Sequence, residues 1–128
     1  MTLRVVHIDA GRVWRGGQRQ VFLLEQALRD RGVEPLVIGA ADAPLVGRLR
    51  AAGLAASSVR MLSDWDLRAA YRVRKIVRAW SPDLVHAHDA RSHAIALIAL
   101  HLPLRPIVPR ARGGPPVLVV TRRAVTPV

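Results

Sequence analysis

Residues 3–18 read LRVVHIDAGRVWRGGQ, and this stretch decides the fold of the chain. Its first half is a run of strand-forming residues, its second half ends in Gly16 and Gly17, and an amphipathic helical pattern begins directly afterwards. The order predicts a strand, a glycine turn and a helix start. A helix N-terminus at the carboxyl edge of an α/β sheet offers N–H groups to an anion, and glycine lets the backbone approach it. We therefore predict a phosphate-facing site at this turn.

The rest of the chain alternates between strand patterns and helix patterns. Strands are predicted at 3–8, 33–39, 55–61, 83–87 and 116–121, and helices at 18–31, 42–52, 67–80 and 92–100. Asp42 and a capping box over 63–66 are predicted to begin two of these helices. Such alternation indicates right-handed βαβ crossovers and a doubly wound, mostly parallel, Rossmann-like sheet. At 128 residues the chain is expected to form one domain.

Composition limits the partners and the compartment. The chain has 20 Lys and Arg against nine Asp and Glu, a net charge of +11 that attracts polyanions in general. With one Phe and one Tyr it has few aromatics for stacking bases, so no specific nucleic-acid partner is expected. It has no Cys, which fits a reducing compartment. No apolar run reaches the roughly 20 residues that cross a bilayer, and no signal sequence opens the chain, so we expect a cytoplasmic protein.

One predicted helix is strongly basic. Arg68, Arg72, Arg74, Lys75 and Arg78 interleave with an apolar stripe in the segment 67–80. The simpler interpretation is a core-facing stripe beneath a solvated basic face. The alternative is peripheral docking to an anionic membrane at its inner face, where each basic residue contributes about 1 kcal/mol.

Two predicted strand ends carry histidines and carboxylates. Period-2 alternation places His86 and His88 on the same side of their strand, and we expect His86 to be a packed core residue and His88 to lie at the mouth. Asp89 is predicted to cap the next helix. Asp9 and Asp89 are expected to cap or close loops rather than to act as a hydrolytic pair. Since the other histidines lack metal-ligand spacing, no metal site is predicted.

Several motifs then become familiar. They are Arg4-Val-Val-His-Ile-Asp, Arg15-Gly-Gly-Gln-Arg-Gln-Val, Ala27-Leu-Arg-Asp-Arg-Gly, Ser81-Pro-Asp-Leu-Val-His-Ala-His-Asp-Ala-Arg-Ser-His and Val119-Val-Thr-Arg-Arg. In this order they resemble the N-terminal domain of glycosyltransferase family 4, which has the two-domain GT-B architecture. The resemblance covers nearly the whole chain. It implies retaining transfer of a sugar from a nucleotide-sugar, as substrate and not cofactor, to an acceptor hydroxyl. Relatives often glycosylate lipid-linked or cell-envelope acceptors.

The resemblance also implies roles for individual residues. Gly16 and Gly17 fall on the family's glycine turn, where a backbone N–H meets a donor phosphate. His88 falls on the active-site histidine near the reacting sugar. A position that is often Glu in relatives is Arg19 here, so no side-chain role is carried over to it. Further candidates for substrate contact are Asp9, Arg15, Asp89, Arg91 and Arg122.

In the family, the N-terminal domain mainly holds the acceptor and a C-terminal domain grips the nucleotide. Residues 1–128 contain none of that second domain, so we expect a fragment or a truncated product that does not catalyse alone. The alternative is a stand-alone Rossmann-like module that binds phosphate or nucleotide without catalysis. The sequence indicates neither the acceptor, the donor sugar nor the oligomeric state.

Overall fold

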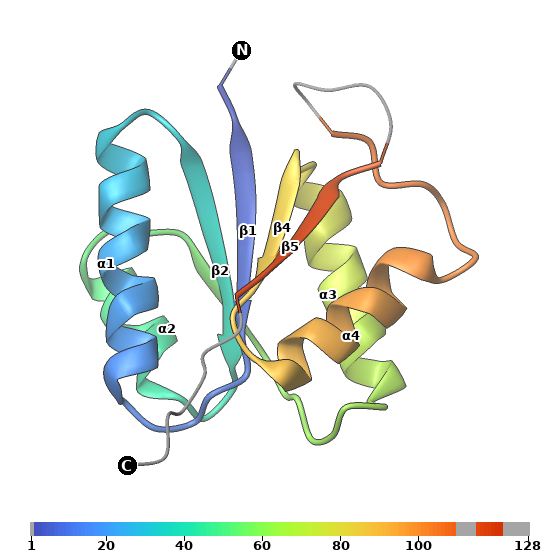
Figure 1. Cartoon of the computed structure of the whole chain (residues 1–128), viewed down its shortest axis with the longest axis horizontal. Coiled ribbons are helices and arrows are strands. Elements are labelled where there is room, and N and C mark those ends of the chain that lie inside the picture. The colour runs from blue at the N-terminus through green and yellow to red at the C-terminus, as the bar shows by residue number, and fades with distance from the viewer. Residues whose placement is uncertain (1, 110–114, 122–128) are drawn as a thin grey trace.

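The computed structural model of the protein describes residues 2–109 and 115–121, and within these ranges strands and helices alternate along the chain (Figure 1). The elements are β1 (Arg4–Asp9), α1 (Gly16–Asp30), β2 (Glu34–Ala40), α2 (Pro44–Ala51), β3 (Ala56–Val59), α3 (Leu67–Trp80), β4 (Leu84–Ala87), α4 (Ala90–His101) and β5 (Val117–Val120). Each lies within a few residues of its predicted position. The predicted α/β alternation is confirmed.

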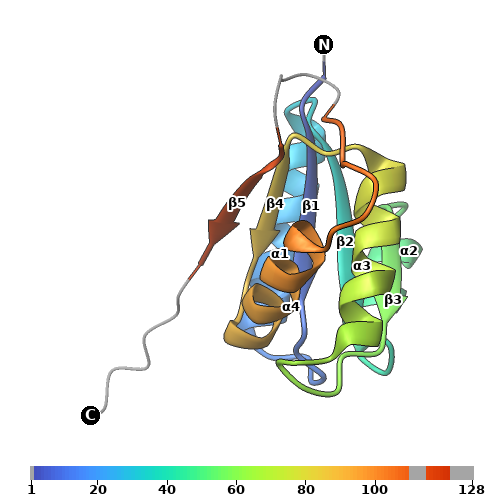
Figure 2. The same cartoon turned by 90° about the vertical axis from the view of Figure 1, so that its right-hand side faces the viewer.

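The strands form one parallel sheet in the order β3-β2-β1-β4-β5. The chain runs outward from β1 to β3 and then returns to place β4 on the other side of β1. Helices α1 and α2 cover one face of the sheet, and α3 and α4 cover the other (Figures 1 and 2). This is the predicted doubly wound, Rossmann-like arrangement, and its strand order reverses between β1 and β4.

The core has one part on each face of the sheet. Side chains of β1, β2 and β4 pack with α3 and α4 in the larger part, which includes Val6, Ile8, Val73 and Ile95. The smaller part lies beneath α1 and α2 and contains Val21, Val37, Leu45, Leu49 and Leu54. Every residue of β1 is buried, because a central parallel strand is covered on both faces.

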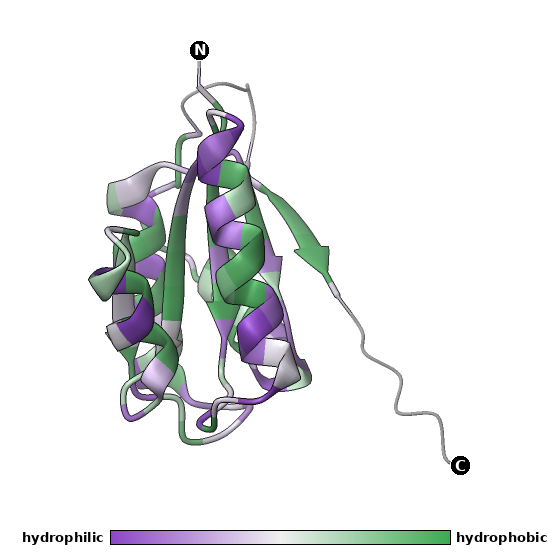
Figure 3. Cartoon of the chain, turned by 90° about the vertical axis from the view of Figure 1, so that its left-hand side faces the viewer, coloured by the Kyte–Doolittle hydropathy of each residue, from purple (hydrophilic) through white to green (hydrophobic). Residues whose placement is uncertain are grey.

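The edge strand β5 is covered less completely. Val117 and Val119 are 39% and 37% exposed, and they pair with Leu84 and His86 of β4. Figure 3 shows β5 as an apolar arrow that stands apart from the helices on the α1 side. The neighbouring part of β4 on this side is therefore open to solvent, which affects His86 below.

The observed N-caps differ from the predicted ones at two helices, α2 and α3. The N-cap of α2 is Ala43, and no described side chain caps it, so the prediction for Asp42 is wrong. Pro44 begins the helix instead, where its missing N–H costs nothing. The cap of α3 is Asp66, at the end of the predicted box: its carboxylate accepts from Ala69 N and from Leu62 N, both at 3.0 Å.

Across the described part of the chain, no helix combines the length and apolar character of a membrane span.

Candidate active site at the carboxyl ends of β1 and β4

A pocket of about 470 Å³ lies where the chain leaves β1 and β4. It is lined by Asp9, Gly11, Arg12, Val13, Arg15, Gly17, Gln18, His88 and Asp89. In an open α/β sheet, the crevice outside the carboxyl ends of the strands at which the order reverses is the usual place for a ligand. The pocket lies at that point, and it brings together Gly17, His88, Asp9, Arg15 and Asp89 of the predicted site residues.

The glycine turn forms one wall of the pocket. Helix α1 begins at Gly16, and its N-cap Arg15 has an extended backbone with no side-chain cap from the described residues. The first turn of α1 carries no acidic side chain of its own, and the N-terminal end of a helix has a positive dipole charge. Arg12 and Arg15 line the same pocket. This arrangement suits an anion such as phosphate.

The two carboxylates beside the turn are engaged with backbone. Asp9 Oδ1 accepts a hydrogen bond from Gly11 N at 2.8 Å. Asp89 Oδ1 accepts from Ser92 N at 2.7 Å in a capping box at the start of α4, which confirms the predicted cap. Asp89 Oδ2 accepts from Ala10 N at 2.8 Å, so Asp89 also ties the exit of β4 to the exit of β1. The two carboxylates shape the pocket by holding its backbone.

Three histidines gather on the α1 side of β1 and β4. His7 lies beside His86 in the sheet register, and the rings of His86 and His88 stack with centroids 4.0 Å apart. His7 Nδ1 lies 2.8 Å from His88 Nε2, and His86 Nε2 is hydrogen-bonded to Thr121 Oγ1. The predicted common side of His86 and His88 is thus confirmed.

The expected burial of His86 and His88 is wrong. His88 is the buried one, at 5% exposure, while His86 is half-buried. His86 neighbours Val119 of the uncovered strand β5, whereas His88 bonds to His7, which is itself 1% exposed in the covered centre of the sheet. His88 nevertheless lines the pocket, as predicted.

The three histidines have the composition of a metal site, because one ring nitrogen from each lies within 4.8 Å of the others. Each nitrogen of His7 has a close neighbour: Nδ1 lies 2.8 Å from His88 Nε2, and Nε2 lies 2.9 Å from Glu25 Oε1 without an aligned hydrogen bond. The distances therefore describe a network of side chains that hold one another. The expectation of no metal site stays a prediction.

With this geometry in place, sequence comparison is decisive. Residues 14–121 match Glycosyltransferase Family 4, a range that contains the glycine turn, the histidine pair and β5. The chain belongs to glycosyltransferase family 4. Among solved structures it is similar to the crystal structure of glycinamide ribonucleotide transformylase 1 from Symbiobacterium toebii, with 22% identity and a TM-score of 0.49. That similarity covers 67% of this chain and 41% of the other. No curated protein sequence matches the chain significantly.

The pocket of this family 4 chain also contains residues that the sequence did not single out. A Cβ added to Gly11 would lie 2.9 Å from Asp9 Oδ1 and 3.0 Å from Gln18 Nε2, whereas one added to Gly16 meets nothing within 4 Å. Gln18 is buried and donates to Gly11 O. Its position after the glycine pair was visible in the sequence, but its contact lies seven residues earlier in the chain. The turn therefore requires a glycine at position 11, because any side chain there would collide with Asp9 and Gln18.

Two predicted residues, Gly16 and Arg91, do not belong to the described lining of the pocket. Gly16 faces open space, as the absence of atoms around its built Cβ shows. Arg91 Nε lies 3.4 Å from Asp64 Oδ1 in an exposed ion pair at the loop before α3. Arg122 lies outside the described residues.

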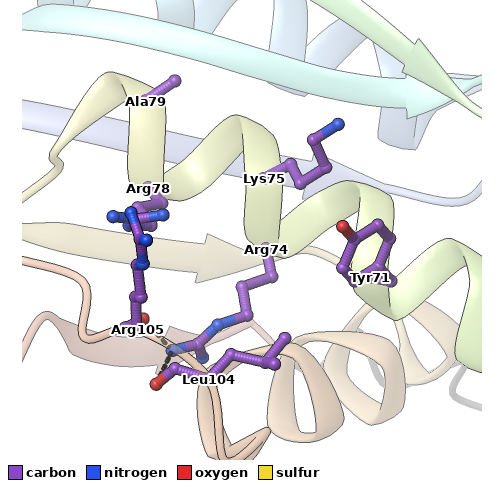
Figure 4. Close-up of a pocket in the computed structure, with 7 residues that line it drawn as sticks. All are labelled: Tyr71, Arg74, Lys75, Arg78, Ala79, Leu104 and Arg105. Carbon is purple, nitrogen blue, oxygen red and sulfur yellow. Dashed lines mark hydrogen bonds between the residues drawn. The ribbon is translucent and has the colours of Figure 1, made fainter.

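The basic helix α3 differs from the expected solvated face. Arg74 is 5% exposed, and its guanidinium donates to Ala99 O at 2.8 Å. It also donates to Leu104 O at 3.3 Å and to Arg105 O (Figure 4). It fixes the segment after α4 and is not a surface charge. At the start of α3, Leu67 and Tyr71 of the predicted core stripe are 65% and 50% exposed.

A second cavity of about 570 Å³ lies against α3. It is lined by Tyr71, Arg74, Lys75, Arg78, Ala79, Leu104 and Arg105, and in Figure 4 the side chains of Arg78 and Arg105 point toward each other. No acidic residue belongs to this described lining. Trp65, just before α3, is 82% exposed. A neighbouring pocket is lined by Leu67, Arg68, Tyr71 and Arg72, so Tyr71 lines both. Cations and exposed apolar side chains therefore share one surface, which we call the α3 surface: Leu67, Arg68, Tyr71, Arg72, Lys75, Arg78, Leu104 and Arg105.

Proposed function

We propose that this chain is the acceptor-side domain of a retaining glycosyltransferase that moves a sugar from a nucleotide-sugar to an acceptor hydroxyl. Family membership supports the reaction class. The observation that carries the proposal is that the glycine turn and His88 line one pocket at the point where the strand order reverses. A phosphate-binding wall and an imidazole then face the same ligand.

The two walls of the pocket have different tasks in this proposal. The start of α1, with Gly17, Arg12 and Arg15, provides positive charge and close backbone approach for the donor diphosphate. His88 provides a ring that can exchange a hydrogen bond or a proton with a sugar hydroxyl near neutral pH. A second domain, outside residues 1–128, would grip the nucleotide. The isolated chain is therefore expected to bind nucleotide-sugars weakly and not to transfer sugar.

Calorimetric titration of the isolated chain with UDP- and GDP-sugars tests this division of labour. Weak binding without transfer is expected, and addition of a donor-binding domain by fusion should restore transfer. In the fusion, Gly17→Val should abolish transfer while the domain stays folded, because a branched side chain holds the diphosphate away from the backbone. Sub-micromolar affinity of the isolated chain would favour the alternative, a stand-alone nucleotide-binding module.

We further propose that the acceptor is a lipid-linked or cell-envelope glycan, reached by peripheral contact with an anionic membrane. The α3 surface supports this because it combines Lys75, Arg78 and Arg105 with the exposed side chains of Leu67 and Tyr71. Leu67 directly follows the segment that leaves β3, and so lies at the same edge of the sheet as the pocket. Contact there would bring the pocket close to a lipid-linked hydroxyl.

A further inference from the structure

Helix α1 buries a carboxylate that packing does not explain. Glu25 is 1% exposed, and neither of its carboxylate oxygens has a hydrogen-bond donor among the described residues. Removing a carboxylate from water is expensive unless charge or hydrogen bonds compensate. The group beside it is His7, whose Nε2 lies 2.9 Å from Glu25 Oε1. The carboxylate lies off the line of the ring N–H, so it acts on His7 by charge more than by an aligned hydrogen bond.

The same imidazole leads to the pocket. His7 Nδ1 lies 2.8 Å from Nε2 of His88, and His88 lines the pocket together with the glycine turn. A continuous series of short contacts thus joins Glu25 on α1, His7 on β1 and His88 after β4. The series begins at Glu25, which is buried beneath α1, and ends at the pocket at the carboxyl edge of the sheet.

The chemistry of these groups determines where the protons lie. The negative charge of an ionised Glu25 favours a proton on the nearer ring nitrogen of a neutral His7, which is Nε2. Its Nδ1 is then an acceptor, and the 2.8 Å contact requires His88 Nε2 to be the donor. A neutral His88 with its proton on Nε2 has an acceptor at Nδ1. Acting through His7, the carboxylate of Glu25 thereby sets the tautomer of His88.

We propose that Glu25 and His7 are positioning residues that hold His88 in its Nε2–H tautomer and so fix which ring nitrogen donates and which accepts at the pocket. The use of this tautomer by a sugar or acceptor hydroxyl rests on the proposed function. Glu25 and His7 themselves do not line the pocket.

Long-range proton–nitrogen spectra of the ¹⁵N-labelled chain test the tautomer directly, at about pH 7.5, where an ordinary histidine is mostly neutral. The chain has five histidines, so the ring signals can be assigned by single substitutions. We expect His7 and His88 each to show the Nε2–H pattern. A neutral His88 with its proton on Nδ1 would overturn the proposal.

The variant Glu25→Leu removes the carboxylate but keeps a similar volume, and apolar replacement of a buried charge is often tolerated. In this variant His88 should lose its single tautomer and show a mixture. The control is Glu34→Gln, which removes a surface carboxylate paired with Arg4 at 3.1 Å and should leave both rings unchanged. An unaltered His88 pattern in Glu25→Leu would refute the role of Glu25. If this variant does not fold, the tautomer of His88 in the wild-type chain still tests the proposal.

These spectra need neither donor nor acceptor, so they separate the two proposals. Failure of the fused enzyme to transfer sugar, with His88 in the expected tautomer, would refute the proposed function and leave the tautomer assignment standing. Sugar transfer with His88 in the other tautomer would do the reverse.

Discussion

His86 and His88 illustrate how two neighbouring residues of one type acquire different roles. Both rings lie on the α1 side of β4, but His88 is buried, bonded to His7 and part of the pocket. In a fusion with a donor-binding domain, His88→Ala should lower kcat by about 10²–10³, the cost of one aligned transition-state contact. Because the ring is buried and hydrogen-bonded, the same variant should also lose about 1–3 kcal/mol of unfolding free energy.

The matched comparison is His86→Ala. Its ring is half-buried beside the open strand β5, so its loss should cost less unfolding free energy than the loss of His88 and affect kcat less. Single-turnover rates and urea unfolding of both variants measure the two quantities. A larger rate loss in His86→Ala would remove His88 from the centre of the mechanism.

The glycines of the turn make a second comparison at the scale of single residues. In Gly11→Ala the new Cβ would press on Asp9 Oδ1 and Gln18 Nε2, the two groups that hydrogen-bond to the backbone of Gly11. The turn must shift, and we expect a loss of about 1–3 kcal/mol of unfolding free energy. Gly16→Ala meets nothing within 4 Å and should stay within about 0.5 kcal/mol of wild type. Equal thermal unfolding of the two variants would contradict the packing described for the turn.

At the scale of elements, the helix starts are treated differently. Asp66 and Asp89 cap α3 and α4 with their side chains, whereas no side chain among the described residues caps α1 or α2. Of these two, α1 faces the pocket. A helix start that is finished by its own side chain has less to offer a ligand, since the first N–H groups are already used. The contrast agrees with the anion-binding role proposed for α1.

The cap of α3 gives a pH prediction. Backbone N–H groups of Leu62 and Ala69 bond to the Asp66 carboxylate and hold its pKa below the ordinary value, because they favour the charged form. The stability that Asp66 contributes is therefore fully present above its unfolded-state pKa and is lost as the pH falls through the folded-state pKa. Asp66→Ala should cost about 1 kcal/mol at neutral pH, and the difference from wild type should shrink as the pH falls from the unfolded-state pKa of Asp66 through its lower folded-state pKa. Urea unfolding at several pH values measures it, and a pH-independent difference would contradict the cap.

Arg74 links α3 to the end of α4. Its guanidinium binds the carbonyl of Ala99 and those of Leu104 and Arg105. Arg74→Met keeps the aliphatic stem but leaves these carbonyls without the donor, so we expect a loss of about 1.5–3 kcal/mol. Arg72→Met, on the exposed side of the same helix, is the control and should change little. Thermal unfolding that is equal in the two variants would show that Arg74 is not structural.

At the scale of the whole molecule, the net charge of +11 attracts the chain to anionic surfaces. The chain should bind vesicles that contain phosphatidylglycerol and not those of phosphatidylcholine alone, with binding that weakens as salt rises. Arg78→Glu changes the charge of the α3 surface by two units, so it should weaken vesicle binding by about tenfold or more. Arg31→Glu makes the same change at the end of α1, on the other face of the sheet, and is the matched control.

Vesicle sedimentation measures both variants at equal salt. Equal losses for Arg78→Glu and Arg31→Glu would mean that net charge alone drives binding, and the proposed membrane-facing surface would fail. Absence of binding by the wild-type chain would remove the membrane from the proposal but leave the glycosyltransferase assignment in place.

The sequence by itself determined the order of the elements, the parallel sheet, the glycine turn and the cap at Asp89. These depend on the spacing of apolar residues and on hydrogen bonds between residues a few positions apart, both of which can be read from a local stretch. Family membership and the position of His88 at a strand exit were predictable for the same reason, because the motifs are contiguous.

The tertiary structure alone decided which of these residues meet. His7 and His88 are 81 residues apart, and they touch because β4 returns to lie beside β1. The burial of Glu25 against His7, the exposure of His86 and the inward turn of Arg74 likewise depend on which element covers which face. Periodicity indicates that a residue faces the sheet or the solvent, but not what stands opposite it. The partner of each buried polar side chain is therefore fixed only when distant strands and helices pack together.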